Sequence, residues 1–92
     1  MAKTARHMLL SGRVQGVGFR YFVQQKAREC QLTGWVKNLP NGKVEIEAEG
    51  EEQDINCFID YLKIGNGYSR TNQLSQSQVQ PSADFSDFTI RY

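Results

Sequence analysis

A single stretch, Gly12-Arg13-Val14-Gln15-Gly16-Val17-Gly18-Phe19-Arg20, carries this chain from an apolar strand through a glycine-rich turn into an amphipathic helix. Unpaired N–H groups at the start of a helix, together with the positive end of the helix dipole, make a site for an anion. Glycines let the backbone approach a ligand closely, and an arginine adds a fork of donors matched to phosphate oxygens. The stretch therefore predicts a phosphate site, with a plain turn followed by a solvated arginine as the alternative.

Apolar periodicity places this junction within a regular series of strands and helices. Both expected helices repeat apolar residues every three or four positions, and Lys43 to Glu49 alternates apolar with charged residues, so that strand has one buried and one wet face. The run Met8-Leu9-Leu10 is typical of a strand buried on both sides. The expected strands are 7–14, 35–39, 43–49, 74–80 and 88–92, the helices are 19–30 and 51 to a stop at Gly65, and Gly65–Thr71 and Pro81–Asp87 are a loop and a turn region.

The order β-α-β-β-α-β predicts an α+β ferredoxin-like sandwich, an antiparallel sheet with two helices packed on one face. In that plan the first and second strands run parallel, with the third strand between them, so their carboxyl ends lie at the same edge of the sheet. We therefore expect Asn38, near the end of the second strand, to lie next to the loop that leaves the first strand at Gln15 to Arg20.

Composition limits the protein to a small single domain. The 92 residues, of which 39% are hydrophobic and 23% charged, allow one domain over residues 1–92 with a modest core. The net charge of +1 gives no electrostatic case for nucleic acid or an anionic membrane. The longest apolar run near the start, Met8 to Leu10, is too short for a signal peptide, and no stretch could span a bilayer. We therefore expect a cytoplasmic monomer.

The two cysteines, Cys30 and Cys57, form no disulfide framework and match no metal-binding spacing, and a single histidine, His7, makes a zinc site implausible. Each cysteine falls on the apolar face of an expected helix, which favours a buried thiol. A bridge between them stays open, because antiparallel helices would bring the end of the first helix near the start of the second.

A second segment that bears on function is Gly34-Trp35-Val36-Lys37-Asn38. Together the two segments resemble the signatures of the acylphosphatases, small hydrolases of carboxyl-phosphate anhydrides. The first signature reads Leu10-Ser11-Gly12-Arg13-Val14-Gln15-Gly16-Val17-Gly18-Phe19-Arg20, and the second reads Gly34-Trp35-Val36-Lys37-Asn38-Leu39-Pro40-Asn41-Gly42-Lys43-Val44 and closes at Gly50. The ending Phe88-Thr89-Ile90-Arg91-Tyr92 is similar to the family's last strand, so the resemblance covers essentially the whole chain. Only Thr71 to Asp87, rich in Ser and Gln, departs from the pattern.

The resemblance implies a metal-independent enzyme with no cofactor and no covalent intermediate, acting on small-molecule acyl phosphates. It implies that Arg20 and the N–H groups of Gln15, Gly16, Val17, Gly18 and Phe19 hold the phosphate, and that Asn38 orients the attacking water. The leaving group is a carboxylate with a pKa near ~4, so it departs without a proton, and positioning and electrostatics suffice for catalysis. From the residues alone, the favoured interpretation of Asn38 is an ordinary asparagine before a turn.

Other classes of protein fit less well. A thiol phosphatase needs a nucleophilic cysteine six positions before its arginine, where Val14 stands, and a nucleotide P-loop needs Lys and then Ser or Thr after its glycines. RNA-recognition modules of this fold need aromatics on the third strand, which here carries three glutamates and one lysine and no aromatic residue. The alternatives that remain are a non-catalytic phosphate- or acyl-phosphate-binding module and a domain of a larger carbamoyl-transfer maturation protein. Arg20 and Asn38, with no linker at either end, favour a free-standing enzyme.

Overall fold

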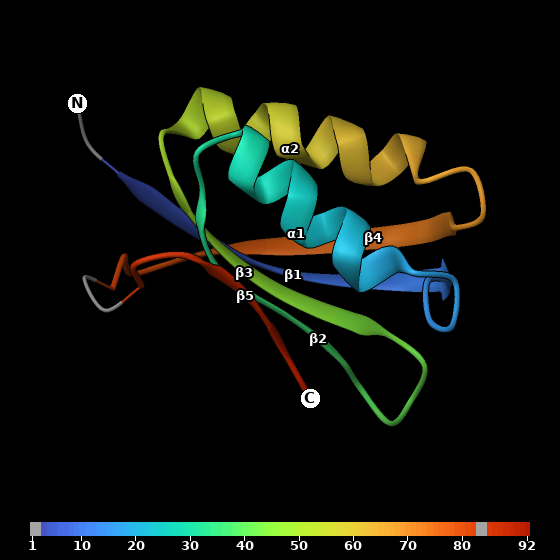
Figure 1. Cartoon of the computed structure of the whole chain (residues 1–92). Helices are drawn as coiled ribbons and strands as arrows, with labels where there is room; N and C mark the ends of the chain where they lie inside the picture. Colours follow the sequence, from blue (N-terminus) through green and yellow to red (C-terminus); the bar gives the residue numbers. More distant parts are fainter. Residues whose placement is uncertain (1–2, 83–84) are drawn as a thin grey trace.

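The computed structural model describes residues 3–82 and 85–92, and in this part of the chain two helices cover one face of a five-stranded sheet (Figure 1). The strands are β1 (Thr4–Arg13), β2 (Thr33–Asn38), β3 (Val44–Gly50), β4 (Arg70–Val79) and β5 (Phe88–Arg91), and the helices are α1 (Phe19–Glu29) and α2 (Glu52–Ile64). The predicted α+β ferredoxin-like order is therefore confirmed, and most predicted bounds differ from these by one to four residues.

The sheet has the strand order β4-β1-β3-β2-β5. β1 and β2 both pair antiparallel with β3, so they run parallel to each other with β3 between them, as predicted. The expectation of a wholly antiparallel sheet is wrong, because β5 pairs parallel with β2. The reason lies in the connection before β5. Since β4 ends beside the start of β1, at the edge of the sheet where β2 begins, a chain crossing that edge enters β5 in the direction of β2.

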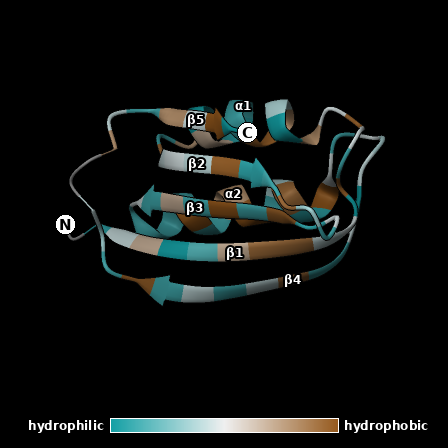
Figure 2. Ribbon diagram, turned by 90° about the horizontal axis from the view of Figure 1, so that it is seen from below, coloured by the Kyte–Doolittle hydropathy of each residue, from teal (hydrophilic) through white to brown (hydrophobic). Residues whose placement is uncertain are grey.

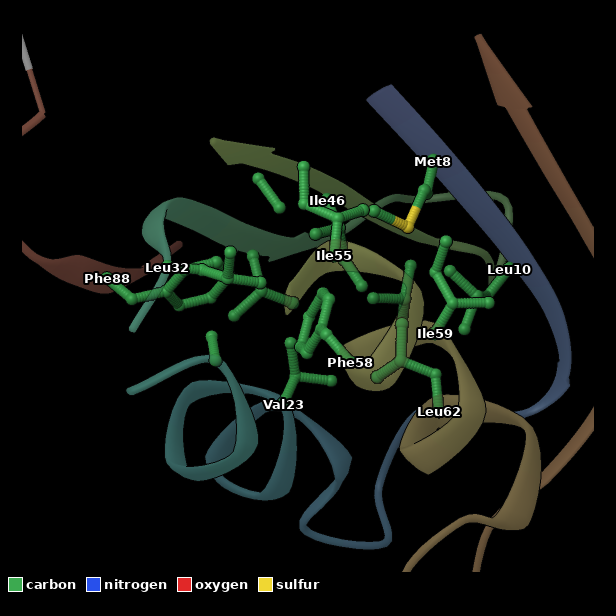
Figure 3. Packing of buried hydrophobic residues seen from close by; sticks show 14 of the residues in the cluster. Met8, Leu10, Val23, Leu32, Ile46, Ile55, Phe58, Ile59, Leu62 and Phe88 are labelled. Carbon is green, nitrogen blue, oxygen red and sulfur yellow. The ribbon is translucent and has the colours of Figure 1, made fainter. Parts of the chain in front are cut away.

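The hydrophobic core fills the space between the sheet and the helices (Figure 3). The sheet contributes Met8, Leu10, Val36, Val44, Ile46, Ala48 and Phe88, and the helices contribute Phe19, Val23, Ala27, Ile55, Phe58, Ile59 and Leu62. The rings of Phe58 and Phe88 meet edge to face with their centroids 6.0 Å apart, an arrangement that aromatic pairs prefer. Full burial of a large apolar side chain contributes about 1.5–3 kcal/mol of stability, so the core holds α1 firmly over β2 and β5.

On the other face of the sheet the described residues form no helix, and Figure 2 views the molecule from this side. Leu9 therefore lies half-buried on the open face, and the prediction that β1 is buried on both sides is wrong. The wet face predicted for β3 has one exception, Glu49, which is only 4% exposed. Its Oε2 accepts a hydrogen bond from the backbone N–H of Ser82 at 2.9 Å, because the segment after β4 turns back over this end of the sheet.

The edge strand β4 is longer than its sequence indicates. The sequence predicts a strand at 74–80, yet the ladder with β1 begins at Arg70, opposite Arg13, and shifts register between Ser11 and Gly12. Ser and Gln give a weak strand signal, but the ladder is made by backbone groups, so β1 can hold the whole segment. The loop expected at Gly65–Thr71 shortens to 65–69. The expected turn at Pro81–Asp87 falls partly on residues 83–84, outside the described residues.

Both cysteines are free thiols. Cys30, which caps α1, is buried, but Cys57 is exposed on α2, so the prediction of a buried thiol is wrong for Cys57. Burial, reinforced by a hydrogen bond with the Cys57 thiol, raises the pKa of Cys30 to about 11. No helix within the described residues is long and apolar enough to cross a membrane.

Candidate active site

The loop between β1 and α1, residues 14–18, exposes backbone donors at the start of a helix. Gly16 and Gly18 adopt left-handed φ angles of 73° and 74°, a conformation that costs other residues about 1–2 kcal/mol. A Cβ at either position would meet nothing within 4 Å. Glycine is therefore needed here for the backbone conformation and not because a side chain would lack room. Across the described residues, the N–H groups of Gln15 to Phe19 donate no hydrogen bond. The loop thus has the unpaired donors and the helix N-terminus that an anion site needs.

A cavity of about 120 Å³ opens at this loop, lined by Val14, Gly16, Gly18, Phe19, Arg20, Tyr21 and Asn38. The two sequence segments therefore meet at one place, as the strand order predicted. Gln15 and Val17, which the resemblance also places at the phosphate, are not among the residues that line the cavity. Its lining contains one formal charge, the guanidinium of Arg20, so the charge of the cavity is complementary to an anion.

Gln15 ties the β1–α1 loop to the turn between β2 and β3. Its Nε2 donates to the backbone oxygens of Leu39 at 2.8 Å and Lys43 at 2.9 Å. Because Leu39 directly follows Asn38, these two hydrogen bonds hold the end of β2 against the loop. Sequence analysis missed this contact, since a glutamine in a glycine-rich turn gives no sign of its partner.

Arg20 lies in the first turn of α1 and contacts the end of the chain. Its Nη1 donates to the backbone oxygen of Arg91 at 3.3 Å, and its Cζ lies 4.7 Å from the centroid of the Tyr92 ring. A guanidinium has five N–H donors, so most of them stay available to a ligand. The ring contact is a cation–π interaction, which is worth roughly 0.5–1 kcal/mol at an exposed site. Arg91 and Tyr92 thereby restrict the orientation of Arg20.

Asn38 presents a buried acceptor without a partner. Its Oδ1 is inaccessible to solvent and accepts no hydrogen bond from the described residues. Leaving a buried polar atom unpaired costs about 1–3 kcal/mol, and native proteins rarely do so. Asn38 also lines the cavity, so its carboxamide can form a hydrogen bond with a small polar molecule there.

A further asparagine, Asn66, contacts the β1–α1 loop from the loop between α2 and β4. Its Nδ2 donates to the backbone oxygen of Val17 at 3.0 Å. Sequence analysis gave Asn66 no role, and the only sign of it was its place in the loop between α2 and β4. Among the described residues, no group of three or more His, Cys, Asp or Glu side chains is placed to hold a metal ion.

Fold and cavity together define a class of protein, a ferredoxin-like α+β sandwich with an arginine-containing cavity at the start of its first helix. Comparison with known proteins identifies the family. The sequence profile of the acylphosphatase family matches residues 6–90. An acylphosphatase from Geobacillus thermodenitrificans is 44% identical over 86 residues, which cover 94% of this chain and 92% of that relative.

Solved structures agree. The crystal structure of an acylphosphatase from Bacillus subtilis matches with a TM-score of 0.92 at 40% identity, over 97% of this chain and 99% of that chain. Full-length HypF, in its phosphate- and nucleotide-bound form, matches with a TM-score of 0.89 at 36% identity, over 99% of this chain but 12% of that chain. The chain belongs to the acylphosphatase family, and it is a hydrolase acting on acid anhydrides.

Proposed function

We propose that the β1–α1 loop, Arg20 and Asn38 form the active site, which hydrolyses acyl phosphates to a carboxylate and inorganic phosphate without a metal ion. One observation carries this proposal. Gly16, Gly18 and Phe19, whose N–H groups are unpaired across the described residues, line one cavity together with Arg20 and Asn38. These are the three parts that phosphoryl transfer to water requires: a phosphate cradle, a positive charge and a group to orient the water.

The cradle binds the phosphoryl group. Backbone N–H groups at the start of α1 donate to the phosphoryl oxygens, and the helix dipole adds to the attraction. Arg20 contributes a planar pair of donors and neutralises the charge on the equatorial oxygens. Because these groups are already fixed by the glycine conformations and by the contacts of Arg20 with the chain end, little reorganisation is needed when the substrate binds.

Asn38 orients the nucleophile. Its carboxamide, which carries both a donor and an acceptor, binds a water at the cavity and directs the oxygen of that water in line with the bond to be broken. A bond forms between the water oxygen and phosphorus as the bond from phosphorus to the acyl oxygen breaks. The electron pair leaves with the carboxylate, and both hydrogens of the water stay with the inorganic phosphate. The carboxylate is a good leaving group, so no general acid is needed.

The size of the cavity fits a site that encloses only the phosphoryl group of the substrate. At about 120 Å³ it is well below the roughly 300–1,000 Å³ of sites that enclose a drug-sized ligand. It therefore receives the phosphoryl group, while the acyl group extends past the rim at Tyr21, whose side chain is 66% exposed. Two free thiols fit a reducing compartment such as the cytoplasm.

The test is hydrolysis of benzoyl phosphate in the presence of EDTA. We expect turnover by the unaltered protein, and a loss of about 10²-fold or more in both Arg20→Ala and Asn38→Ala. Matched controls are Arg28→Ala, an exposed arginine of α1, and Asn56→Ala, an exposed asparagine of α2, which should both keep full activity. Turnover that requires a metal ion, or variants as fast as the unaltered protein, would contradict the proposal. An inactive protein that still binds inorganic phosphate would favour the non-catalytic module instead.

A further inference from the structure

A second loop, residues 65–69 between α2 and β4, lies against the β1–α1 loop at the same end of the molecule (Figure 1). The ladder between β1 and β4 brings the two loops together, since its last pair is Arg13 with Arg70. Gly12 makes the approach close, because a Cβ there would clash with the backbone oxygen of Arg70. The two loops are thus direct continuations of two strands in tight contact.

Asn66 joins the two loops, and its side chain is fixed from its own side. Its Oδ1 accepts hydrogen bonds from the backbone N–H groups of Tyr68 at 2.9 Å and Ser69 at 2.8 Å. The backbone N–H of Asn66 donates to Oγ of Ser69 at 3.1 Å. With the carboxamide held by its oxygen, its nitrogen has a defined direction, and it donates to the backbone oxygen of Val17 at 3.0 Å.

That hydrogen bond settles the orientation of a peptide group in the β1–α1 loop. The bond between Val17 and Gly18 is trans and planar, so its C=O and N–H point in opposite directions. Asn66 holds the carbonyl of Val17 toward the 65–69 loop, which turns the N–H of Gly18 the other way. Gly18 lines the cavity, whereas Asn66 is not among its lining residues. Rotation of this peptide would instead aim a carbonyl oxygen at an anion in the cavity, and left-handed glycines on both sides of Val17 make such a rotation sterically accessible.

We propose that Asn66 is a positioning residue of the active site: through the carbonyl of Val17 it keeps the N–H of Gly18 turned toward the bound phosphoryl group. This inference rests on the proposed function, because it assumes that the loop binds phosphate. It assigns to the 65–69 loop a function in substrate binding that does not require contact with the substrate.

Two variants separate this role from general damage to the loop. Asn66→Asp keeps an oxygen for the N–H groups of Tyr68 and Ser69 but loses the donor to Val17. Asn66→Ala loses both, without adding a charge that could repel phosphate. The effect that both variants share therefore belongs to the lost donor. Asn56→Asp and Asn56→Ala make the same changes on the exposed surface of α2 and serve as matched controls.

The readouts are the dissociation constant for inorganic phosphate and KM and kcat for acetyl phosphate and benzoyl phosphate, with thermal melting as a check on folding. In both Asn66 variants we expect the phosphate dissociation constant to rise about tenfold, the scale of one lost hydrogen bond. KM should rise by the same factor for both substrates, because the loop faces the phosphoryl group that they share. In an amide NMR spectrum, the signal of Gly18 should respond less to phosphate in the variants than in the unaltered protein.

Phosphate affinities within twofold of the unaltered protein in both Asn66 variants would overturn the inference while leaving the proposed function standing. A KM change for one substrate alone would also overturn it, since that would indicate contact with the acyl group. An unaltered protein that neither binds phosphate nor hydrolyses the two substrates would overturn the proposed function and this inference together.

Discussion

Two glycine-containing loops lie side by side at one end of this protein, and they use their backbone donors in opposite ways. The β1–α1 loop has left-handed glycines at Gly16 and Gly18, and the 65–69 loop has positive φ angles of 82° at Gly65 and 92° at Gly67. In the 65–69 loop, side chains of the loop itself accept the N–H groups of residues 66, 68 and 69. In the β1–α1 loop, the N–H groups of residues 15–19 are unpaired across the described residues.

Glycine content therefore does not distinguish a ligand-binding loop from a structural one. The two loops differ in whether their backbone N–H groups are already hydrogen-bonded and in which end of a helix lies beside them. The β1–α1 loop precedes a helix, where the dipole attracts an anion, whereas the 65–69 loop follows the carboxyl end of α2, where the dipole repels one. One loop is open to a ligand, and the other is closed upon itself and supports its neighbour.

The largest effect should come from Arg20, the charged residue of the open loop's cavity. Arg20→Lys keeps the charge but loses the planar fork of donors, so kcat/KM for benzoyl phosphate should fall by about 10²-fold or more. Arg28→Lys, further along α1, should leave activity unchanged. A lysine variant with near-normal activity would mean that charge alone suffices and that the fork geometry is unimportant.

A matched pair of glycines tests the comparison itself. Gly18→Ala and Gly67→Ala each place a side chain at a positive φ with open space around it, so each should cost about 1–2 kcal/mol of unfolding free energy. Only Gly18→Ala should weaken phosphate binding, by about tenfold, because only that backbone bears a donor facing the cavity. Denaturant unfolding and phosphate titration measure the two effects, and equal losses of affinity in both variants would break the distinction between the loops.

Two exposed tyrosines give a smaller effect. Tyr92 stacks on the Arg20 guanidinium, and Tyr68 belongs to the closed loop. Tyr92→Ala should lower kcat/KM by about two- to fivefold, the size of an exposed cation–π contact, while Tyr68→Ala should have no effect because only its backbone is used. Steady-state kinetics on both variants decides the matter, and a larger loss in Tyr68→Ala would implicate the closed loop directly in substrate contact.

The cysteines lie toward the far ends of the helices from both loops and should give the smallest effect. Alkylation of exposed Cys57 should leave activity unchanged.

Because burial raises the pKa of Cys30 from its ordinary value near 9 to about 11, Cys30 should react slowly at pH 8, and its rate of alkylation should keep rising up to about pH 11. The folded state then holds its thiol proton more tightly than the unfolded state, so the free energy of unfolding should fall as pH rises from about 9 to about 11. Mass spectrometry of timed alkylation and denaturation at several pH values test both; a plateau near pH 9 would contradict the raised pKa.

Much of the fold followed from the sequence because periodicity records which faces are buried. The alternation in β3 and the apolar stripes of the helices place those elements and so the order of the sheet. The direction of β5 did not follow, since it depends on where the connection from β4 crosses the sheet. The full length of β4 was hidden as well, because its ladder with β1 is made by the backbone and not by its Ser and Gln side chains.

In the candidate site, too, only some of the features could be predicted from the sequence. The strand order brought Asn38 to the cavity that Arg20 and the glycines line, as the sequence predicted. The supporting contacts could not be predicted. Gln15 bonds a backbone oxygen 24 positions away and Asn66 bonds one 49 positions away, and no local pattern marks such a partner. Amides that bind backbone oxygens become visible only when the loops are placed in space.

The most direct test of the account is an amide NMR titration of the isotopically labelled protein with inorganic phosphate. We expect the largest shifts on the amides of residues 15–19, whereas those of residues 66, 68 and 69, whose hydrogens are already bonded within their loop, should move little. Shifts of equal size in both loops, or none in residues 15–19 at concentrations that inhibit hydrolysis, would contradict the claim that unpaired donors distinguish the binding loop from its neighbour.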